Sequence, residues 1–115
     1  MAIYTKTAYG TTTINFVGEF TFKEFSLFQR VQKEIYKNPP KDGNFVLDLA
    51  DTTKIDGIAM GMLTDMAQEL GDECKKVIII NTKPKVFESM HDVGFHKVFK
   101  IISDTNSQTS SEFMQ

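Results

Sequence analysis

The sequence predicts a single α/β domain built on a mixed β-sheet. Residues 45–49 and 77–80 are almost continuously apolar, which is typical of strands buried on both faces of a sheet. The chain opens with residues that alternate between two faces, as in a strand. Stretches whose apolar residues recur at helical spacing separate the apolar runs. The expected order of elements is β-β-α-β-α-β-α-β, with an antiparallel opening hairpin and parallel crossover connections after it.

Length and composition limit the possible functions. The chain has 115 residues, enough for one domain, and its net charge of −2 gives no reason to expect nucleic acid as a partner. Cys74 is the single cysteine, so an internal disulfide is excluded and a cytoplasmic location is expected. No stretch approaches the roughly 20 apolar residues of a spanning helix, so we expect no insertion into a membrane.

The opening half of the chain contains a hairpin and a helix. Residues 3–9 and 12–17 alternate on either side of a turn at Gly10, which predicts an antiparallel pair of strands. A helix start follows, with Thr21 as N-cap, Glu24 reaching back to it, and Phe20 packed on Phe25. The helix is expected to end at Asn38-Pro39-Pro40. Its inward positions are Phe22, Phe25, Phe28, Val31 and Ile35.

The central stretch combines a strand with a second helix. After the strand at 45–49, the turn at 54–57 is a strand-to-helix junction, and apolar residues recur at helical spacing to Leu70. At 100° per residue the apolar half holds positions 58, 59, 62, 63, 66, 67 and 70. Gly57, Gly61, Thr64 and Gln68 occupy the other half, and a stop is expected at 71–73.

The last third of the chain predicts a third helix and a final strand. Thr82 is the expected cap, Pro84 lies in the first turn, and Gly94 is a left-handed stop. Phe95 is expected to pack back on the helix, whose inward residues are Val86, Phe87, Met90 and Val93. A short strand at 98–102 completes the expected domain, 1–102, and the polar residues 103–115 predict a disordered tail.

Several segments together resemble the STAS domain of anti-sigma-factor antagonists. They read Val17-Gly18-Glu19-Phe20, then Val46-Leu47-Asp48-Leu49, then Lys54-Ile55-Asp56-Gly57-Ile58-Ala59-Met60-Gly61-Met62-Leu63, and finally Val93-Gly94-Phe95. The resemblance covers residues 14–102 and implies a STAS-like fold. It also implies a non-enzymatic regulatory module of signal transduction and transcription, which binds an anti-sigma factor or a switch-kinase-like protein.

Gly57 departs from the pattern of that family. It stands where the family carries a serine that a partner kinase phosphorylates, and glycine has no hydroxyl to accept a phosphate. By this resemblance the protein is fixed in an unphosphorylated-like state. Thr52 and Thr53, just upstream, are the alternative phosphoacceptors. A glycine at this position is equally compatible with a simple tight turn.

The small, uncharged face at the start of the second helix is a candidate partner-binding patch. Gly57, Met60, Gly61 and Thr64 form its core, and Ile58 is a further candidate contact. Lys54 and Asp56 are expected at its rim. The alternative is that Met60 packs in the core and the glycines only relieve crowding.

Other chemistry is not indicated by the sequence. Asp48, Asp51 and Asp56 have the spacing of no metal loop, and His91 and His96 are expected to be surface or capping residues. A nucleophile elbow and a glycine-rich phosphate loop are both missing, so neither an enzyme nor a cofactor is expected.

The sequence is also compatible with two further functions. Stand-alone STAS proteins also accompany transporter ATPases, so the chain is alternatively a small cytosolic subunit of an ABC-type membrane transport complex. A small ligand, such as a nucleotide or a lipid, could instead bind in a groove near the start of the second helix. The aromatic-rich opening strands fit a monomer surface and a dimer edge equally well.

Overall fold

The computed structural model describes residues 1–40, 44–70 and 76–103 and confirms the mixed α/β class. Along the chain, its strands and helices are β1 (Ala2–Ala8), β2 (Thr11–Phe20), α1 (Phe25–Lys37), β3 (Asn44–Asp48), β4 (Thr52–Ile55), α2 (Gly57–Leu70), β5 (Lys76–Thr82), α3 (Pro84–Asp92) and β6 (Lys100–Ser103). Short 3₁₀ turns cover Phe22–Glu24 and Phe95–Lys97.

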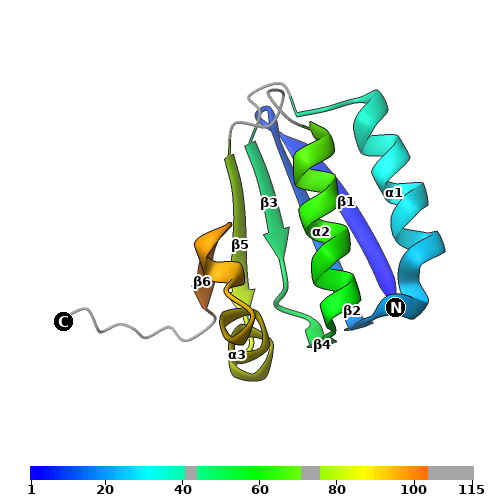
Figure 1. Ribbon diagram of the computed structural model, residues 1–115. Coiled ribbons are helices and arrows are strands. Elements are labelled where there is room, and N and C mark those ends of the chain that lie inside the picture. Colours follow the sequence, from blue (N-terminus) through cyan, green and yellow to red (C-terminus); the bar gives the residue numbers. More distant parts are fainter. Residues whose placement is uncertain (41–43, 71–75, 104–115) are drawn as a thin grey trace.

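The sheet has the strand order β1-β2-β3-β5-β6, with β4 paired to β2 outside this path. β1 is antiparallel to β2, and the other pairs are parallel, as expected. Tyr9 and Gly10, with φ of 52° and 83°, form the two-residue turn of the hairpin, where both positions need positive φ. Helices α1 and α2 lie side by side over one face of the sheet (Figure 1).

Strand β4 is the element that the sequence does not predict. β3 pairs with Thr11–Asn15 of β2, and β4 then pairs with the end of the same strand, so Lys54 and Ile55 belong to a strand and not to a turn. The register shifts beside Gly18, whose φ of 105° and N–H bond to the Asp51 carbonyl (2.9 Å) accommodate the irregularity. A strand of four residues, three of them polar, carries too little apolar pattern to be recognised.

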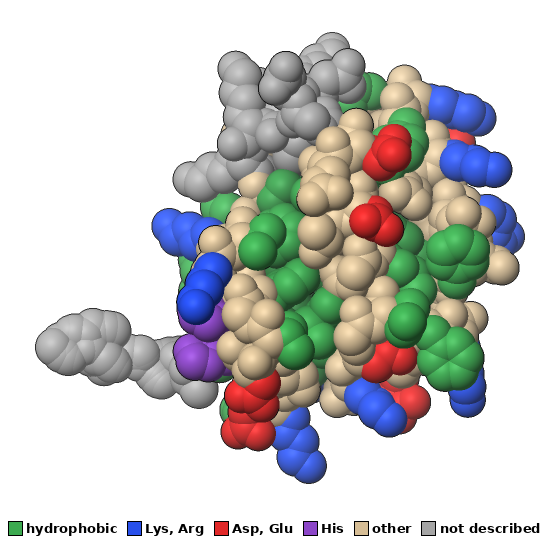
Figure 2. All heavy atoms as spheres, in the orientation of Figure 1, with side chains coloured by type: hydrophobic (Ala, Val, Ile, Leu, Met, Phe, Trp, Pro, Cys, Tyr) green, Lys and Arg blue, Asp and Glu red, His purple; other side chains and the backbone are tan. Residues whose placement is uncertain are grey.

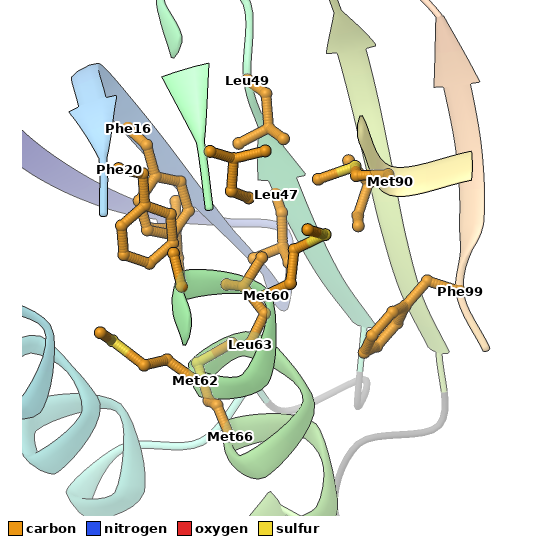
Figure 3. Close-up of a cluster of buried hydrophobic side chains, with 14 of the residues drawn as sticks. Phe16, Phe20, Leu47, Leu49, Met60, Met62, Leu63, Met66, Met90 and Phe99 are labelled. Atoms are coloured by element: carbon orange, nitrogen blue, oxygen red, sulfur yellow. The ribbon is translucent and has the colours of Figure 1, made fainter. Parts of the chain in front are cut away.

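The core lies between the sheet and the helices. Phe16 stacks on Phe20 with 4.8 Å between ring centroids, and Phe28 of α1 lies 5.6 Å from Phe20. Met62 and Leu63 bring α2 into the same cluster (Figure 3). Completely buried residues therefore come from β2, β3, α1 and α2 together.

The start of the first helix differs from the prediction. Thr21 caps the 3₁₀ turn, accepting from the Lys23 N–H at 3.4 Å, and α1 begins only at Phe25. Among the described residues no hydrogen bond joins the Glu24 side chain to Thr21. Phe22 and Phe25, predicted to point inward, are 58% and 52% exposed. A 3₁₀ turn has about three residues per turn, so it shifts these side chains out of the phase of the helix.

The third helix also begins differently. Thr82 is not its cap, because Thr82 is a buried residue of β5, and Lys83 occupies the cap position without a side-chain bond. Pro84 and Gly94 (φ 77°) have their predicted roles, whereas Val93 is 64% exposed.

The end of the described chain contains a short 3₁₀ turn and the last strand. Phe95 of the turn packs on Phe99, with 4.8 Å between centroids, and β6 covers Lys100–Ser103, where the sequence predicted a strand at 98–102. The predicted turn at 41–43, the helix stop at 71–73 and the tail from 104 to 115 lie outside the described residues.

Thr52 provides a test of how β4 is held. Its hydroxyl is buried and donates to the Phe16 carbonyl at 2.7 Å, so Thr52→Val leaves a buried acceptor without this donor. We expect the free energy of unfolding in urea to fall by about 1–3 kcal/mol. Thr53→Val is the matched control, because Thr53 is exposed on the same strand. Equal stability of the two variants would contradict this role.

Candidate functional site

Asp56 organises the junction between β4 and α2. Its Oδ1 accepts from the Ala59 N–H at 2.8 Å, the usual bond of an N-cap residue, and its Oδ2 accepts from the Phe22 N–H at 3.0 Å. Its own N–H donates to the Phe20 carbonyl at 3.2 Å. One carboxylate therefore joins the start of α2 to the 3₁₀ turn that leads into α1. The sequence placed Asp56 at the rim of a patch but gave no signal of its bond to Phe22.

Gly57 and Gly61 are both exposed on α2. A Cβ atom added to either would meet no heavy atom within 4 Å, so these glycines do not relieve crowding inside the protein. Glycine within a helix is less favourable than alanine by up to about 1 kcal/mol. The fold itself therefore offers no reason for Gly61.

Of the two candidate contacts Met60 and Ile58, only Ile58 reaches the surface. Met60 is 6% exposed and lies in the layer between α2 and the sheet (Figure 3), whereas Ile58, expected on the apolar half, is 60% exposed. The buried side of α2 is centred on Ala59, Leu63 and Met66, so the helix is rotated relative to the predicted phase. Met60 is thus a core residue in the described structure.

The surface left at the start of α2 consists of Gly57, Ile58, Gly61 and the half-buried Thr64, and we name these four residues the α2 face. The Thr64 hydroxyl donates to the Met60 carbonyl at 3.1 Å. Two further large side chains, Phe22 and Phe25, are more than half exposed. The backbone of Phe22 is held at Asp56, so this residue sits next to the start of α2.

Hydrophobic side chains gather on this side of the molecule, toward the start of α1 (Figure 2). Exposed apolar groups that cluster in this way mark interaction surfaces more often than scattered ones do. Sequence reasoning missed Phe22 and Phe25 because their spacing assigned them to the core.

The two candidate phosphoacceptors differ in accessibility. Thr52 is completely buried and its hydroxyl is engaged with Phe16, whereas Thr53 is exposed on β4. Lys54 is exposed beside it. Together with Lys85 of α3, these two residues line a cavity of about 360 Å³ between β4 and α3.

The acidic and histidine residues considered as metal ligands have other surroundings. Among the described residues no group of three potential ligands is close enough to hold a metal ion. Asp48 Oδ1 accepts from the Ala50 N–H at 3.0 Å and from Asn81 Nδ2 at 3.2 Å. Asp51 is exposed. Across residues 1–40, 44–70 and 76–103, no helix is long and apolar enough to cross a membrane.

His91 and His96 are exposed, and their rings stack with centroids 4.0 Å apart and an angle of 9° between planes. Desolvation of the His96 ring lowers its pKa below the ordinary 6.5, and the nearby His91 and Lys97 charges lower it further. The predicted surface position of both histidines agrees with the structure.

Comparison with known proteins gives a consistent result. Residues 2–108 match the family model of the STAS domain. A STAS-domain containing protein of Pseudomonas aeruginosa is 28% identical over 89 residues, which cover 77% of this chain and 85% of that protein.

Solved structures share the fold at low sequence identity. An anti-sigma factor antagonist from Mycobacterium paratuberculosis matches with a TM-score of 0.77 and 16% identity, over 88% of this chain and 84% of the other. A sulfate transporter family protein from Wolinella succinogenes matches with a TM-score of 0.69 and 15% identity, over 89% and 83%.

Substitution of Asp56 tests its double role. Asp56→Ala removes the acceptors of two N–H groups at helix starts, and we expect it to lower the free energy of unfolding by about 1–3 kcal/mol. Asp51→Ala is the matched control, since its exposed side chain makes no hydrogen bond among the described residues. Chemical denaturation of both variants measures the difference, and equal losses would refute the capping role.

Titration by NMR tests the histidine stack. We expect His96 to titrate below pH 6.5 and His91→Ala to raise its pKa, because the substitution removes both the stacked ring and a neighbouring charge. A pKa lowered on folding means that the unfolded chain binds the proton more tightly. Stability therefore declines as pH falls from about 6.5 through the folded-state pKa of His96. A His96 pKa that is unchanged in the variant would contradict the stack.

Proposed function

Because this chain belongs to the STAS domain family, we propose that it is a non-enzymatic regulatory module that acts by binding a protein partner. The partner is an anti-sigma factor or a serine-kinase-like regulator of the partner-switching kind. The structural likeness to an anti-sigma factor antagonist supports this choice. Occupancy of the α2 face is sufficient for such a role, and no chemistry by the chain itself is needed.

Gly61 is the observation that carries the proposal. It is exposed in the second turn of α2, and a Cβ atom added there would have no neighbour within 4 Å apart from the adjacent residues and the backbone of its own helix. The fold therefore tolerates a larger residue that would also make the helix more stable. Close approach of a partner backbone gives the glycine a purpose, since only glycine leaves the helix surface free at that position.

Apolar contact area around Gly61 supports the same role. Ile58, Phe22 and Phe25 are each more than half exposed, and burying large hydrophobic side chains contributes about 25 cal/mol per Å² of apolar surface. Lys54 and Asp56 remain as polar residues at the edge. An apolar centre with a polar rim is the usual composition of a protein interface.

The regulation that we propose follows from Gly57. It is exposed at the first position of α2 and has no hydroxyl. We propose that this chain therefore works without the serine switch of the family. Control then comes from the abundance of partners or from competition between them. Thr53 is the accessible hydroxyl if a modification takes the place of the switch, because Thr52 is buried.

A second candidate function is that of a small cytosolic subunit in an ABC-type membrane transport complex. The likeness to a sulfate transporter family protein favours it. The same α2 face serves in both functions, and the identity of the bound protein distinguishes them. Affinity purification of the tagged chain from its native cells, followed by mass spectrometry, yields either a signalling regulator or a transporter ATPase.

The Gly61→Arg variant tests the proposed docking face. We expect it to bind the captured partner at least tenfold more weakly by calorimetry, because the arginine side chain projects from the α2 face where the partner approaches. Its circular dichroism remains that of the parent protein, since the site has room for a side chain. Glu88→Arg, at an exposed position of α3, is the control and leaves binding unchanged.

Gly61→Ala completes this test. Alanine is expected to raise the free energy of unfolding by about 0.5–1 kcal/mol. Partner binding that is unaffected by arginine at position 61 in a folded variant would eliminate the α2 face as the docking site.

A further inference from the structure

A groove of about 600 Å³ lies between α1 and α2, beyond the α2 face. Phe28 and Met62, both almost completely buried, form its floor. Phe25 and Tyr36 of α1 are eleven residues apart, so the α1 side of the groove is about 16 Å long at 1.5 Å per residue. Its walls are polar and contain Gln29, Gln32, Lys33, Asp65, Gln68 and Glu69.

The wall formed by α2 is acidic. Asp65 and Glu69 are exposed one turn apart, and Gly57–Leu70 contains no lysine or arginine. Among the described residues neither carboxylate has a cation within ion-pair distance, and the ion pair found there joins Lys37 to Glu34. Acidic side chains lie over α2 in Figure 2, while basic ones lie along the outer side of α1.

The Tyr36 hydroxyl lies in the groove, close enough to the two acidic side chains for their charges to affect its pKa. Burial raises the pKa of its hydroxyl, and the Glu69 and Asp65 charges raise it further, although the hydrogen bond with Gln32 opposes the shift. Both carboxylates thus act on the groove and not only on solvent. A cation placed along the α2 wall would be attracted by the same two charges, whereas Lys33 lines the α1 wall.

We propose that this groove binds a basic amphipathic helix of a protein partner. Apolar residues of that helix pack on Phe25, Phe28 and Met62, and its lysine or arginine side chains pair with Asp65 and Glu69. Every described residue that lines the groove belongs to α1 or α2, so a helix laid along it is the favoured occupant. Three turns of a partner helix match the length between Phe25 and Tyr36.

This inference deepens the proposed function, on which it rests. Phe25 belongs both to the exposed aromatic pair beside the α2 face and to the groove. The two surfaces are therefore continuous, so one partner can place a helix in the groove while its remaining surface covers Gly61.

An 18-residue helical peptide of leucine and lysine, with its leucines on one face, is a suitable probe. We expect it to bind the full-length ¹⁵N-labelled chain and to shift the amide signals of Gln29, Gln32 and Gln68 most strongly. Substituting Asp65→Lys and Glu69→Lys together should weaken binding at least tenfold. Both positions are exposed, and a lysine at position 69, in the last turn of α2, is compatible with the helix dipole, so the variant is expected to fold.

Two controls make the result specific to the groove. Glu88→Lys removes an exposed acid of α3 and should leave binding of the peptide unchanged. A peptide with glutamate in place of lysine should not bind. Undiminished binding to the doubly substituted chain, signal changes outside the groove, or equal binding of the acidic peptide would each overturn the proposal.

The same variants separate this inference from the proposed function. If the peptide fails to bind while Gly61→Arg still weakens binding of the captured partner at least tenfold, the groove is rejected and the α2 face is retained. If Gly61→Arg has no effect while the doubly substituted chain loses the partner, the α2 face is rejected and the groove is retained.

Discussion

The apolar surface at the start of α1 and α2 depends on the carboxylate of Asp56. Its two oxygens accept from Ala59 and from Phe22, residues that belong to different helical segments and lie far apart in the chain. These bonds fix the start of α2 beside the turn that leads into α1. This 3₁₀ turn leaves Phe22 and Phe25 on the surface, near the α2 face. A capping interaction that is ordinary in energy thus decides which apolar groups face a partner.

Local patterns in the sequence were sufficient for the general fold. The alternating hairpin, the prolines that end α1, the β-branched run in β5 and the left-handed Gly94 each have one strongly preferred structure. Strand β4 was not predicted, because its four mainly polar residues carry no periodic signal and it pairs with a strand that is distant in the sequence. The hydrogen bond between Asp56 and Phe22 joins residues 34 apart, so no local sequence pattern could predict it.

The structure shows which residues of the predicted patch reach the surface. Met60, expected in its core, is buried, whereas Ile58 is exposed, because the hydrophobic positions around α2 are too numerous to define its buried side from the sequence. The 3₁₀ turn similarly moved two phenylalanines from the expected core to the surface. Gly61 kept its predicted exposure, and the open space around it removes crowding as an explanation. The glycine therefore makes physical sense as an accommodation to something outside the chain.

In the proposed function, a protein partner docks at the start of α2. Ile58 of α2 and Ile102 of β6 are both large aliphatic residues with exposed fractions of 60% and 48%, on different parts of the surface. Methyl NMR of isoleucine-labelled protein, titrated with the captured partner, compares them in one sample. We expect a large shift or broadening of the Ile58 methyl signals, with Ile102 unaffected. Perturbation of Ile102 with no change at Ile58 would contradict it.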